Sequence, residues 1–157
     1  MNWMDMSLSE FQSALASSDA TPGGGTAAAV ALGQAAALTQ MVCNLTLGKE
    51  KWQEGWDSAH LAQMVAEKVL QRAGGLAKED SDAFDLVVSA FKLAKETEED
   101  KENRRAAIRA GTLKEAEVPL ETAKLGMELL SILEGLALYG NGSAASDVGV
   151  ASLLASA

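Results

Sequence analysis

Apolar residues recur every three or four positions along much of the chain, which is the spacing of one face of an α-helix. Near the start, Ser7 and Glu10 stand three residues apart, as in a capping box, and predict the beginning of a first helix. The apolar face of that helix has three members: Leu8, Phe11 and Leu15. It is predicted to end at about 17–19. No segment alternates apolar and polar residues as a half-buried strand does, so the pattern predicts an all-α protein.

The second predicted helix, residues 26–47, is apolar on nearly every side. No charged residue lies between Asp19 and Lys49, and alanine is the commonest residue in the segment. A helix of this length can span a bilayer, and that alternative stays open. Gln34, Asn44 and the scarcity of large apolar residues favour a different interpretation. They predict a buried, Ala-rich helix at the centre of a bundle.

Further helices follow from the same spacing and from capping residues. Asp57 is the predicted N-cap of a third helix, which either breaks at the glycines of 73–75 or runs through them. The apolar face resumes after these glycines: Phe84, Val87, Val88 and Phe91. A helix from about Asn103 to Glu117 should end before Pro119, which would begin the next one. Ser146 is the predicted N-cap of the last helix.

Composition narrows the class of protein. With 157 residues and 48% hydrophobic residues, the chain suits one folded domain, residues 1–157, built as a single-domain helical bundle. A net charge of −9 argues against binding to nucleic acid or to an anionic membrane surface. The single cysteine, Cys43, is interpreted as a small buried hydrophobic residue. The chain opens without a signal-peptide pattern, so a cytoplasmic location is expected.

The sequence places three consecutive glycines directly ahead of the apolar helix: Pro22 precedes Gly23, Gly24 and Gly25, and Thr26 follows them. The spacing matches neither the Walker loop nor the dinucleotide-binding loop. Glycine permits positive φ and close approach of another group, and the N–H groups at a helix start attract anions. The residues alone leave two alternatives, a tight corner where helices pack and a ligand site.

One carboxylate stands out by its place on a helix. Asp80 lies one turn before Phe84, at the edge of the predicted apolar face, where a charge costs free energy unless it is paired or functional. Asp82 points in another direction. A simple carboxylate at the edge of the core remains the plainer interpretation of Asp80. His60 is interpreted as a surface histidine, and its distance in sequence from Cys43 gives no metal-ligand spacing.

Five segments occur together in this order: "TPGGGTAAAV", "NLTLGKEKW", "KEDSDAFDLVVSAFK", "EAEVPLETA" and "YGNGSAASDVGVAS". In these segments the chain resembles the formiminotetrahydrofolate cyclodeaminase / methenyltetrahydrofolate cyclohydrolase family, from Leu8 to Leu154. The resemblance implies an all-helical fold that assembles as a homodimer or higher homo-oligomer. It implies a reduced folate, a tetrahydrofolate derivative, as substrate, and no metal or other cofactor. Nucleic acid and membrane are not expected partners.

The resemblance also implies roles for particular residues. Asp80, Lys49 and Asp147 are the implied catalytic residues, and Lys49 is a candidate counter-charge for Asp80 or for a folate carboxylate. The implied substrate-binding residues come from two loops: Pro22, Gly23, Gly24, Gly25, Thr26, Asn141 and Ser146. Within the second loop, Asn141 and Asp147 are expected to hydrogen-bond the pterin ring.

Two reactions are consistent with this resemblance. One cyclises 5-formiminotetrahydrofolate to 5,10-methenyltetrahydrofolate and releases ammonia, and the other interconverts methenyl- and 10-formyltetrahydrofolate. Both pass through a tetrahedral carbon between two nitrogens and require proton transfer. Members of the family continue beyond the segment that matches 145–157, so the chain is expected to lack their C-terminal extension. The alternative is a catalytically idle oligomeric binding or scaffold protein.

Overall fold

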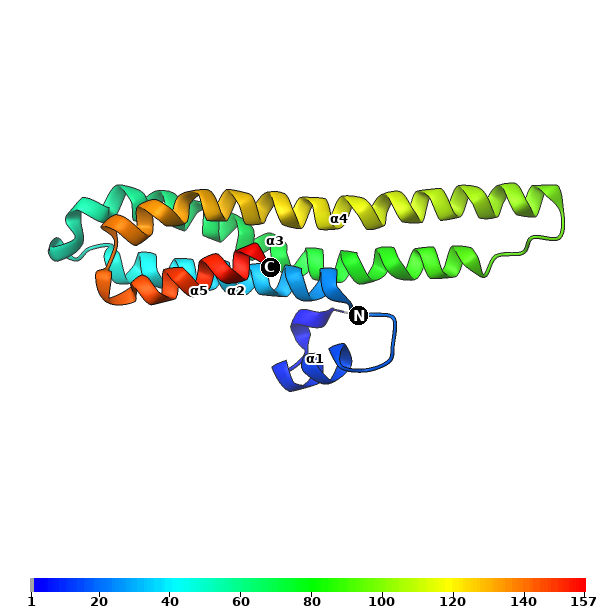
Figure 1. Ribbon diagram of the computed structural model, residues 1–157, viewed down its shortest axis with the longest axis horizontal. Helices are drawn as coiled ribbons and strands as arrows, with labels where there is room; N and C mark the ends of the chain where they lie inside the picture. The colour runs from blue at the N-terminus through cyan, green and yellow to red at the C-terminus, as the bar shows by residue number, and fades with distance from the viewer. Residues whose placement is uncertain (1) are drawn as a thin grey trace.

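The computed structural model describes residues 2–157, whose helices lie side by side in one elongated bundle (Figure 1). The five α-helices are α1 (Leu8–Leu15), α2 (Gly24–Thr46), α3 (Trp56–Phe91), α4 (Glu98–Tyr139) and α5 (Ala145–Ser156). Short 3-10 helices, η1, η2 and η3, cover Trp3–Asp5, Glu50–Gly55 and Gly142–Ala144. The described residues contain no strand. This architecture confirms the predicted all-α, single-domain bundle.

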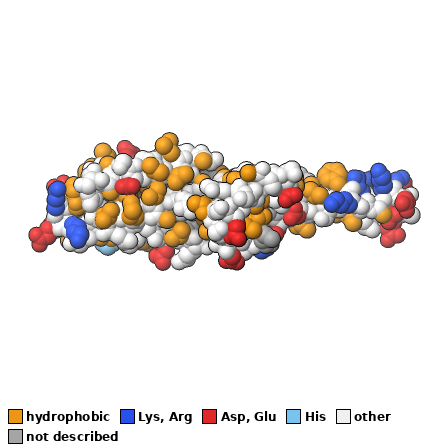
Figure 2. All heavy atoms as spheres, turned by 90° about the horizontal axis from the view of Figure 1, so that it is seen from below, with side chains coloured by type: hydrophobic (Ala, Val, Ile, Leu, Met, Phe, Trp, Pro, Cys, Tyr) orange, Lys and Arg blue, Asp and Glu red, His pale blue; other side chains and the backbone are white. Residues whose placement is uncertain are grey.

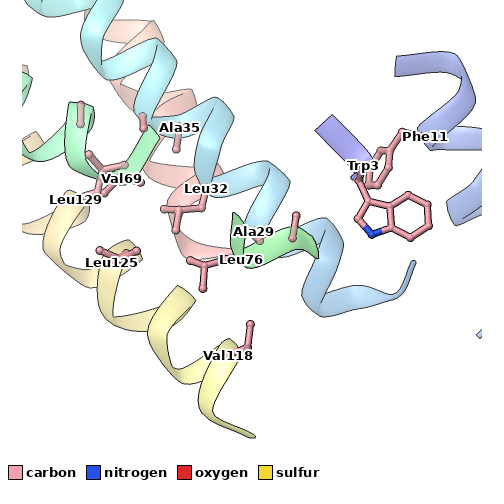
Figure 3. Packing of buried hydrophobic residues seen from close by; sticks show 13 residues of the cluster. Trp3, Phe11, Ala29, Leu32, Ala35, Val69, Leu76, Val118, Leu125 and Leu129 are labelled. Atoms are coloured by element: carbon pink, nitrogen blue, oxygen red, sulfur yellow. The ribbon is translucent and has the colours of Figure 1, made fainter. Parts of the chain in front are cut away.

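The central helix is α2, which packs against α3, α4 and α5. Its buried side consists largely of small residues, and a Cβ added at Gly33 would lie 3.3 Å from the Cβ of Ala73 on α3. The larger buried side chains gather around it, with Leu32 of α2 close to Leu76 and Leu129 (Figure 3). The predicted Ala-rich central helix is therefore confirmed.

The same helix is also long and apolar enough to cross a membrane. Half of its most apolar 18-residue window is buried inside the protein. The core helix of a water-soluble protein meets the same criterion of length and hydropathy. Burial against three helices explains why α2 is apolar on nearly every side, while the expectation that no membrane is involved stays a prediction.

Two helices continue through residues that can end a helix, one as an alternative that the sequence left open and one against the prediction. The α3 helix runs through Gly74 and Gly75 without a break, and α4 runs through Pro119. The expected boundary at Pro119 is therefore wrong. An internal proline costs about 3 kcal/mol in a helix, but tertiary contacts hold both of its flanks. Val118 is buried at 2% exposure, and Glu121 is paired with an arginine of α3.

Helix beginnings agree with the sequence only in part. The capping box at the start of α1 is confirmed. Asp57 lies in the first turn of α3 and is not its cap. Ser146 lies inside α5, whose N-cap is Ala144, so the predicted cap is wrong. The cap of α4 is Thr97, well before the expected start near Asn103.

The paired ends of α3 and α4 extend beyond the other helices as an arm, which we define as residues 84–114 (Figure 1). Large apolar side chains on the arm remain exposed by 36–61%: Phe84, Leu86, Phe91, Leu93 and Leu113. A single chain thus leaves part of the predicted apolar face of α3 uncovered. Beneath the middle of the bundle in Figure 1, η1 and α1 lie beside the first turns of α2, where Trp3 and Phe11 join the core (Figure 3).

Candidate functional site

The first turn of α2 carries a carboxylate from α3. Gly23 is the N-cap of the helix and Gly24 its first residue. Thr26 Oγ1 donates a hydrogen bond to Asp80 Oδ2 over 2.8 Å. A Cβ added at Gly25 would lie only 2.7 Å from Asp80 Cγ. Gly25 therefore leaves the space that the carboxylate occupies, and the structure brings these predicted site residues together.

The three glycines differ in what surrounds them. Among residues 2–157 the one glycine with positive φ is Gly48, so the expectation of positive φ in the glycine run is wrong. A Cβ at Gly24 would meet nothing within 4 Å, and at Gly23 the nearest atom would be 3.9 Å away. The close approach that glycine permits occurs at Gly25. The preceding Thr21–Pro22 peptide is cis.

A buried polar chain continues from Thr26. Thr26 is fully buried, and its Oγ1 lies 2.8 Å from Ser81 Oγ. Ser81 Oγ also accepts a hydrogen bond of 2.9 Å from the indole nitrogen of Trp3. Neither Trp3 nor Ser81 was among the predicted site residues. Ser81 could have been found from the sequence. It lies next to Asp80, and a serine hydroxyl that packs against a neighbouring helix needs a hydrogen-bond partner.

A pocket of about 450 Å³ opens next to this turn, between α2, α4 and α5. Its walls are mostly apolar and include Leu32, Pro119, Met127 and Leu154. Gly25 belongs to the pocket wall as well as to the seat of Asp80. The volume falls within the range of small-molecule sites. We define the glycine corner as residues 22–26 with Asp80. Asp80 does not itself line the pocket, so Gly25 is the residue that connects the carboxylate to the cavity.

The remaining predicted site residues lie at the far end of α2. The helix has 23 residues, which at about 1.5 Å per residue is roughly 34 Å. Lys49 follows its C-terminal end and is exposed, whereas Asp80 sits at its N-terminal end. Lys49 therefore does not lie beside Asp80 of the same chain and is not its counter-charge there. Asp147, half-buried in the first turn of α5, belongs to the far end too.

Hydrogen bonds to backbone atoms occupy the far end. The side-chain amide of Asn141 donates to the carbonyl oxygen of Leu45 over 3.1 Å, and its Oδ1 accepts from the backbone of Ser143. The backbone N–H of Asn141 donates to Thr46 Oγ1 over 3.0 Å. Asn141 thus fastens the turn before α5 to the end of α2. Contacts of folate with Asn141, and with the exposed Ser146, stay predictions.

A cluster of ionised side chains joins α3 to α4 two turns before Asp80. Arg72 donates to Glu79 and to Glu121, each at 2.7 Å from the nearest nitrogen. These bonds hold the pKa of both carboxyls below their usual value, and they raise the pKa of Arg72. Because both carboxylates are held by Arg72, this cluster stabilises the pairing of the two long helices.

The other candidate groups do not form a site. Burial raises the pKa of the Cys43 thiol to about 11, which makes it a poor nucleophile and confirms the interpretation as a buried hydrophobic residue. His60 is exposed, as expected. Across residues 2–157, no three His, Cys, Asp or Glu side chains lie close enough together to hold a metal ion.

Known proteins similar to this chain agree with the resemblance. A family model described as formiminotransferase-cyclodeaminase matches residues 7–157. The chain belongs to this family. It is 40% identical over 150 residues to a methenyltetrahydrofolate cyclohydrolase of Methylorubrum extorquens, covering 94% of this chain and 71% of that protein. It is 33% identical to the formimidoyltransferase-cyclodeaminase of Sus scrofa, of which it spans 27%.

The fold of a solved relative agrees as well. A formiminotetrahydrofolate cyclodeaminase from Thermotoga maritima superposes with a TM-score of 0.84 at 29% sequence identity. The match covers 98% of this chain and 72% of the Thermotoga protein. Both bacterial relatives are therefore longer than the chain described here, which represents about seven-tenths of each.

Proposed function

We propose that this chain is a folate one-carbon enzyme, and that it opens the methenyl ring of 5,10-methenyltetrahydrofolate to give 10-formyltetrahydrofolate. One observation carries the proposal: the carboxylate of Asp80 is seated over Gly25 and bonded to Thr26, beside an apolar pocket of about 450 Å³. The 40% identity to a cyclohydrolase supports this choice of reaction.

Asp80 supplies the proton transfer that this reaction needs. Water attacks the cationic methenyl carbon, and the carboxylate takes up a proton from that water as the carbon becomes tetrahedral. The bond from the carbon to N5 then breaks as N5 takes up a proton, the hydroxyl group on the carbon loses its proton to become the formyl oxygen, and the formyl group stays on N10. One proton is released overall. The apolar pocket next to Gly25 accepts the ring system of the folate.

Cyclodeamination is the second candidate, favoured by the structural likeness to the Thermotoga cyclodeaminase. There the N10 nitrogen attacks the formimino carbon on N5 and loses its proton to Asp80. The formimino nitrogen takes up protons and leaves as ammonia, which yields the same methenyl ring. Since both reactions place one tetrahedral carbon between the same two nitrogens, a single carboxylate at the glycine corner serves either.

We further propose that the chain functions as a homodimer or higher homo-oligomer. The exposed apolar side chains of the arm would be covered by a second copy. Charge supports this occupant. The arm contains seven Lys or Arg and six Asp or Glu, a net charge of +1, whereas the rest of the chain carries a net charge of −10. Blue side chains gather towards the tip of the arm in Figure 2.

A second copy also addresses the distance between the two groups of predicted site residues. In an antiparallel homodimer the Lys49 end of one chain lies beside the glycine corner of the other. Mixing Asp80→Asn chains with Lys49→Ala chains would then restore part of the turnover that each variant lacks alone. Sedimentation that gives a stable monomer at micromolar concentration contradicts the assembly.

The reaction consists of proton transfers and bond exchange at one carbon, so we propose that no metal or redox cofactor takes part. We also propose that the reaction occurs in the cytoplasm. Dialysis against a chelator should leave turnover unchanged. Loss of turnover that added divalent metal restores would contradict this part of the proposal.

The deciding experiment follows the ultraviolet absorbance of methenyltetrahydrofolate with purified protein. Decay of the absorbance beyond the uncatalysed rate identifies a cyclohydrolase, and its appearance from 5-formiminotetrahydrofolate identifies a cyclodeaminase. Binding of tetrahydrofolate is measured in parallel by quenching of tryptophan fluorescence. Binding without either turnover, or neither binding nor turnover, contradicts the enzyme and favours the idle binding or scaffold protein.

A further inference from the structure

We propose that Trp3 is a positioning residue for Asp80, acting through Ser81 and Thr26. The inference rests on the proposed function in one respect, because Asp80 is the residue assigned there to proton transfer. Its structural basis is independent of that assignment. A continuous chain of hydrogen bonds joins the indole of Trp3 to the carboxylate of Asp80.

The chain is short, buried and fully connected. Trp3 Nε1 lies 2.9 Å from Ser81 Oγ, Ser81 Oγ lies 2.8 Å from Thr26 Oγ1, and Thr26 Oγ1 lies 2.8 Å from Asp80 Oδ2. The exposures of the first three residues are 9%, 4% and 0%, so water does not compete for these bonds. Hydrogen bonds in such surroundings are stronger than in water and reinforce one another.

The donors all point the same way. An indole N–H can only donate, so Ser81 accepts from Trp3. Thr26 donates its single proton to the carboxylate. The proton in the Ser81–Thr26 bond must then come from Ser81. Each hydroxyl accepts once and donates once, and every donor ends at Asp80, which matches an ionised carboxylate acceptor.

The chain also fixes which carboxylate oxygen is free. Oδ2 is committed to Thr26, whereas Oδ1 faces the backbone of Gly25. No side chain among residues 2–157 hydrogen-bonds to Oδ1. Orientation of the carboxylate by Thr26 therefore leaves Oδ1 as the oxygen that meets substrate, and Trp3 helps to hold that orientation.

Trp3 comes from outside the helical bundle, which makes its position dependent on how the N-terminal segment docks. Its ring packs edge-to-face against Phe11 at 6.3 Å (Figure 3). Next to it, Met4 covers Gly74 so closely that a Cβ there would lie 2.9 Å from Met4 Cγ. Docking of residues 3–11 on α3 and the orientation of Asp80 are thus physically linked.

The test variant is Trp3→Phe, which keeps an aromatic ring against Phe11 and removes the indole donor. We expect kcat for methenyltetrahydrofolate hydrolysis to fall on the order of tenfold, with KM within about twofold, because positioning of the base is lost and the pocket is not. The matched control is Phe11→Leu, which loosens the same packing and keeps the donor. It should lower the melting temperature and reduce kcat at 25 °C much less than Trp3→Phe does.

The dependence on Asp80 is tested in a second background. In Asp80→Asn chains, Trp3→Phe should cause no further loss of kcat, since the group it positions is already altered. Equal losses of kcat in the parent and Asp80→Asn backgrounds would overturn the inference. Equal losses from Trp3→Phe and Phe11→Leu would reduce Trp3 to a packing residue and overturn it too.

A readout without turnover separates this inference from the proposed function. The indole N–H resonance of Trp3, assigned by its loss in Trp3→Phe, should shift in Asp80→Asn and stay in place in Asp82→Asn, whose carboxylate pairs with Lys78 at the surface. If the parent shows no folate turnover but this shift is present, the proposed reaction fails and the positioning of Asp80 stands. An unmoved resonance overturns the positioning, whatever the turnover.

Discussion

The two ends of α2 are held together in different ways. At the glycine corner, side chains bond to side chains: Trp3, Ser81 and Thr26 lead in sequence to Asp80. At the far end, side chains bond to the backbone, as Asn141 does with the carbonyl of Leu45. The corner leaves a carboxylate oxygen free beside a pocket. The far end uses the polar atoms of Asn141 to shape a turn.

The hydrogen bonds at the far end stabilise the fold, whereas those at the glycine corner orient a carboxylate that we assign to proton transfer. Asn141 also shows how a residue that a motif marks for ligand binding can have its amide engaged by the protein itself. Asp80, in contrast, is oriented by a hydrogen bond to one oxygen, and its other oxygen, which faces Gly25, has no side-chain partner among residues 2–157. Substitutions at the corner should therefore change turnover more than stability, and substitutions of residues that shape the far-end turn, such as Thr46, should do the reverse.

The largest effect is expected for Asp80→Asn. The substitution is nearly isosteric and keeps an acceptor for Thr26, but it removes the group that takes up a proton. Loss of a positioned acid–base group lowers the rate on the order of 10²–10⁴-fold. Turnover of methenyltetrahydrofolate is measured beside Asp82→Asn, an exposed neighbour paired with Lys78. Full turnover in Asp80→Asn would show that Asp80 is only a carboxylate at the edge of the core.

The second effect is a contrast between neighbouring glycines. Gly25→Ala places a methyl group 2.7 Å from Asp80 Cγ, so the carboxylate must move and its bond to Thr26 must break or lengthen. We expect a loss of about 1–3 kcal/mol in the free energy of unfolding and a large loss of turnover. Gly24→Ala meets nothing within 4 Å and should be close to neutral. Equal melting temperatures and rates for the two variants would contradict the seating of Asp80.

The third prediction concerns the far end. Thr46→Val removes the acceptor of the Asn141 N–H, so that a half-buried donor loses its partner. We expect a loss of about 1–3 kcal/mol in the free energy of unfolding. Thr39→Val is the matched control, because the Thr39 hydroxyl bonds only to the carbonyl of Ala35 within the same helix. Urea unfolding of both variants checks this, and an equal cost would show that the contact across to Asn141 adds nothing.

Much of the fold could be predicted from the sequence because it depends on local spacing. The capping box of Ser7 and Glu10 was confirmed, as was the Ala-rich central helix. The failures have a common cause in tertiary packing. Pro119 marks a boundary by local rules, but burial of Val118 carries α4 through it. The sequence around Pro119 does not show which helix will pack against it.

The candidate site was predictable in its residues and not in its grouping. Asp80, Gly25 and Thr26 were identified as candidates, and they meet. Lys49 was identified by the same resemblance and lies at the other end of α2. Trp3 was missed because its partner, Ser81, is 78 positions away, and no local pattern shows such a contact. Sequence spacing therefore predicts on which face of a helix a residue lies. Which residues of other elements it contacts depends on the lengths of the helices, which local spacing does not give.

The smallest effect is expected for the exposed ion pairs of Arg72, and it tests whether they contribute less to stability than the buried hydrogen bonds at the glycine corner. Arg72 lowers the pKa of Glu79 and Glu121, so its stabilisation is fully present above their unfolded value of about 4.3 and is lost as the pH falls through the lowered values. At pH 7 we expect Arg72→Met to cost only about 1 kcal/mol, since all three side chains are a third or more exposed to solvent.

The pH dependence supplies the check on that last prediction. Urea unfolding of the parent and of Arg72→Met should differ at pH 7 and converge at acid pH, as the carboxyls of Glu79 and Glu121 become protonated. Lys68→Met is the control, because Lys68 pairs with Glu128 at a more exposed site and should cost less than about 0.5 kcal/mol. A difference between parent and Arg72→Met that persists at low pH would mean that the aliphatic part of Arg72, and not its charge, joins α3 to α4. Arg72 would then stabilise the protein by packing. Among residues 2–157, the chain of hydrogen bonds from Trp3 to Asp80 would be the one side-chain network near the corner whose hydrogen bonds matter.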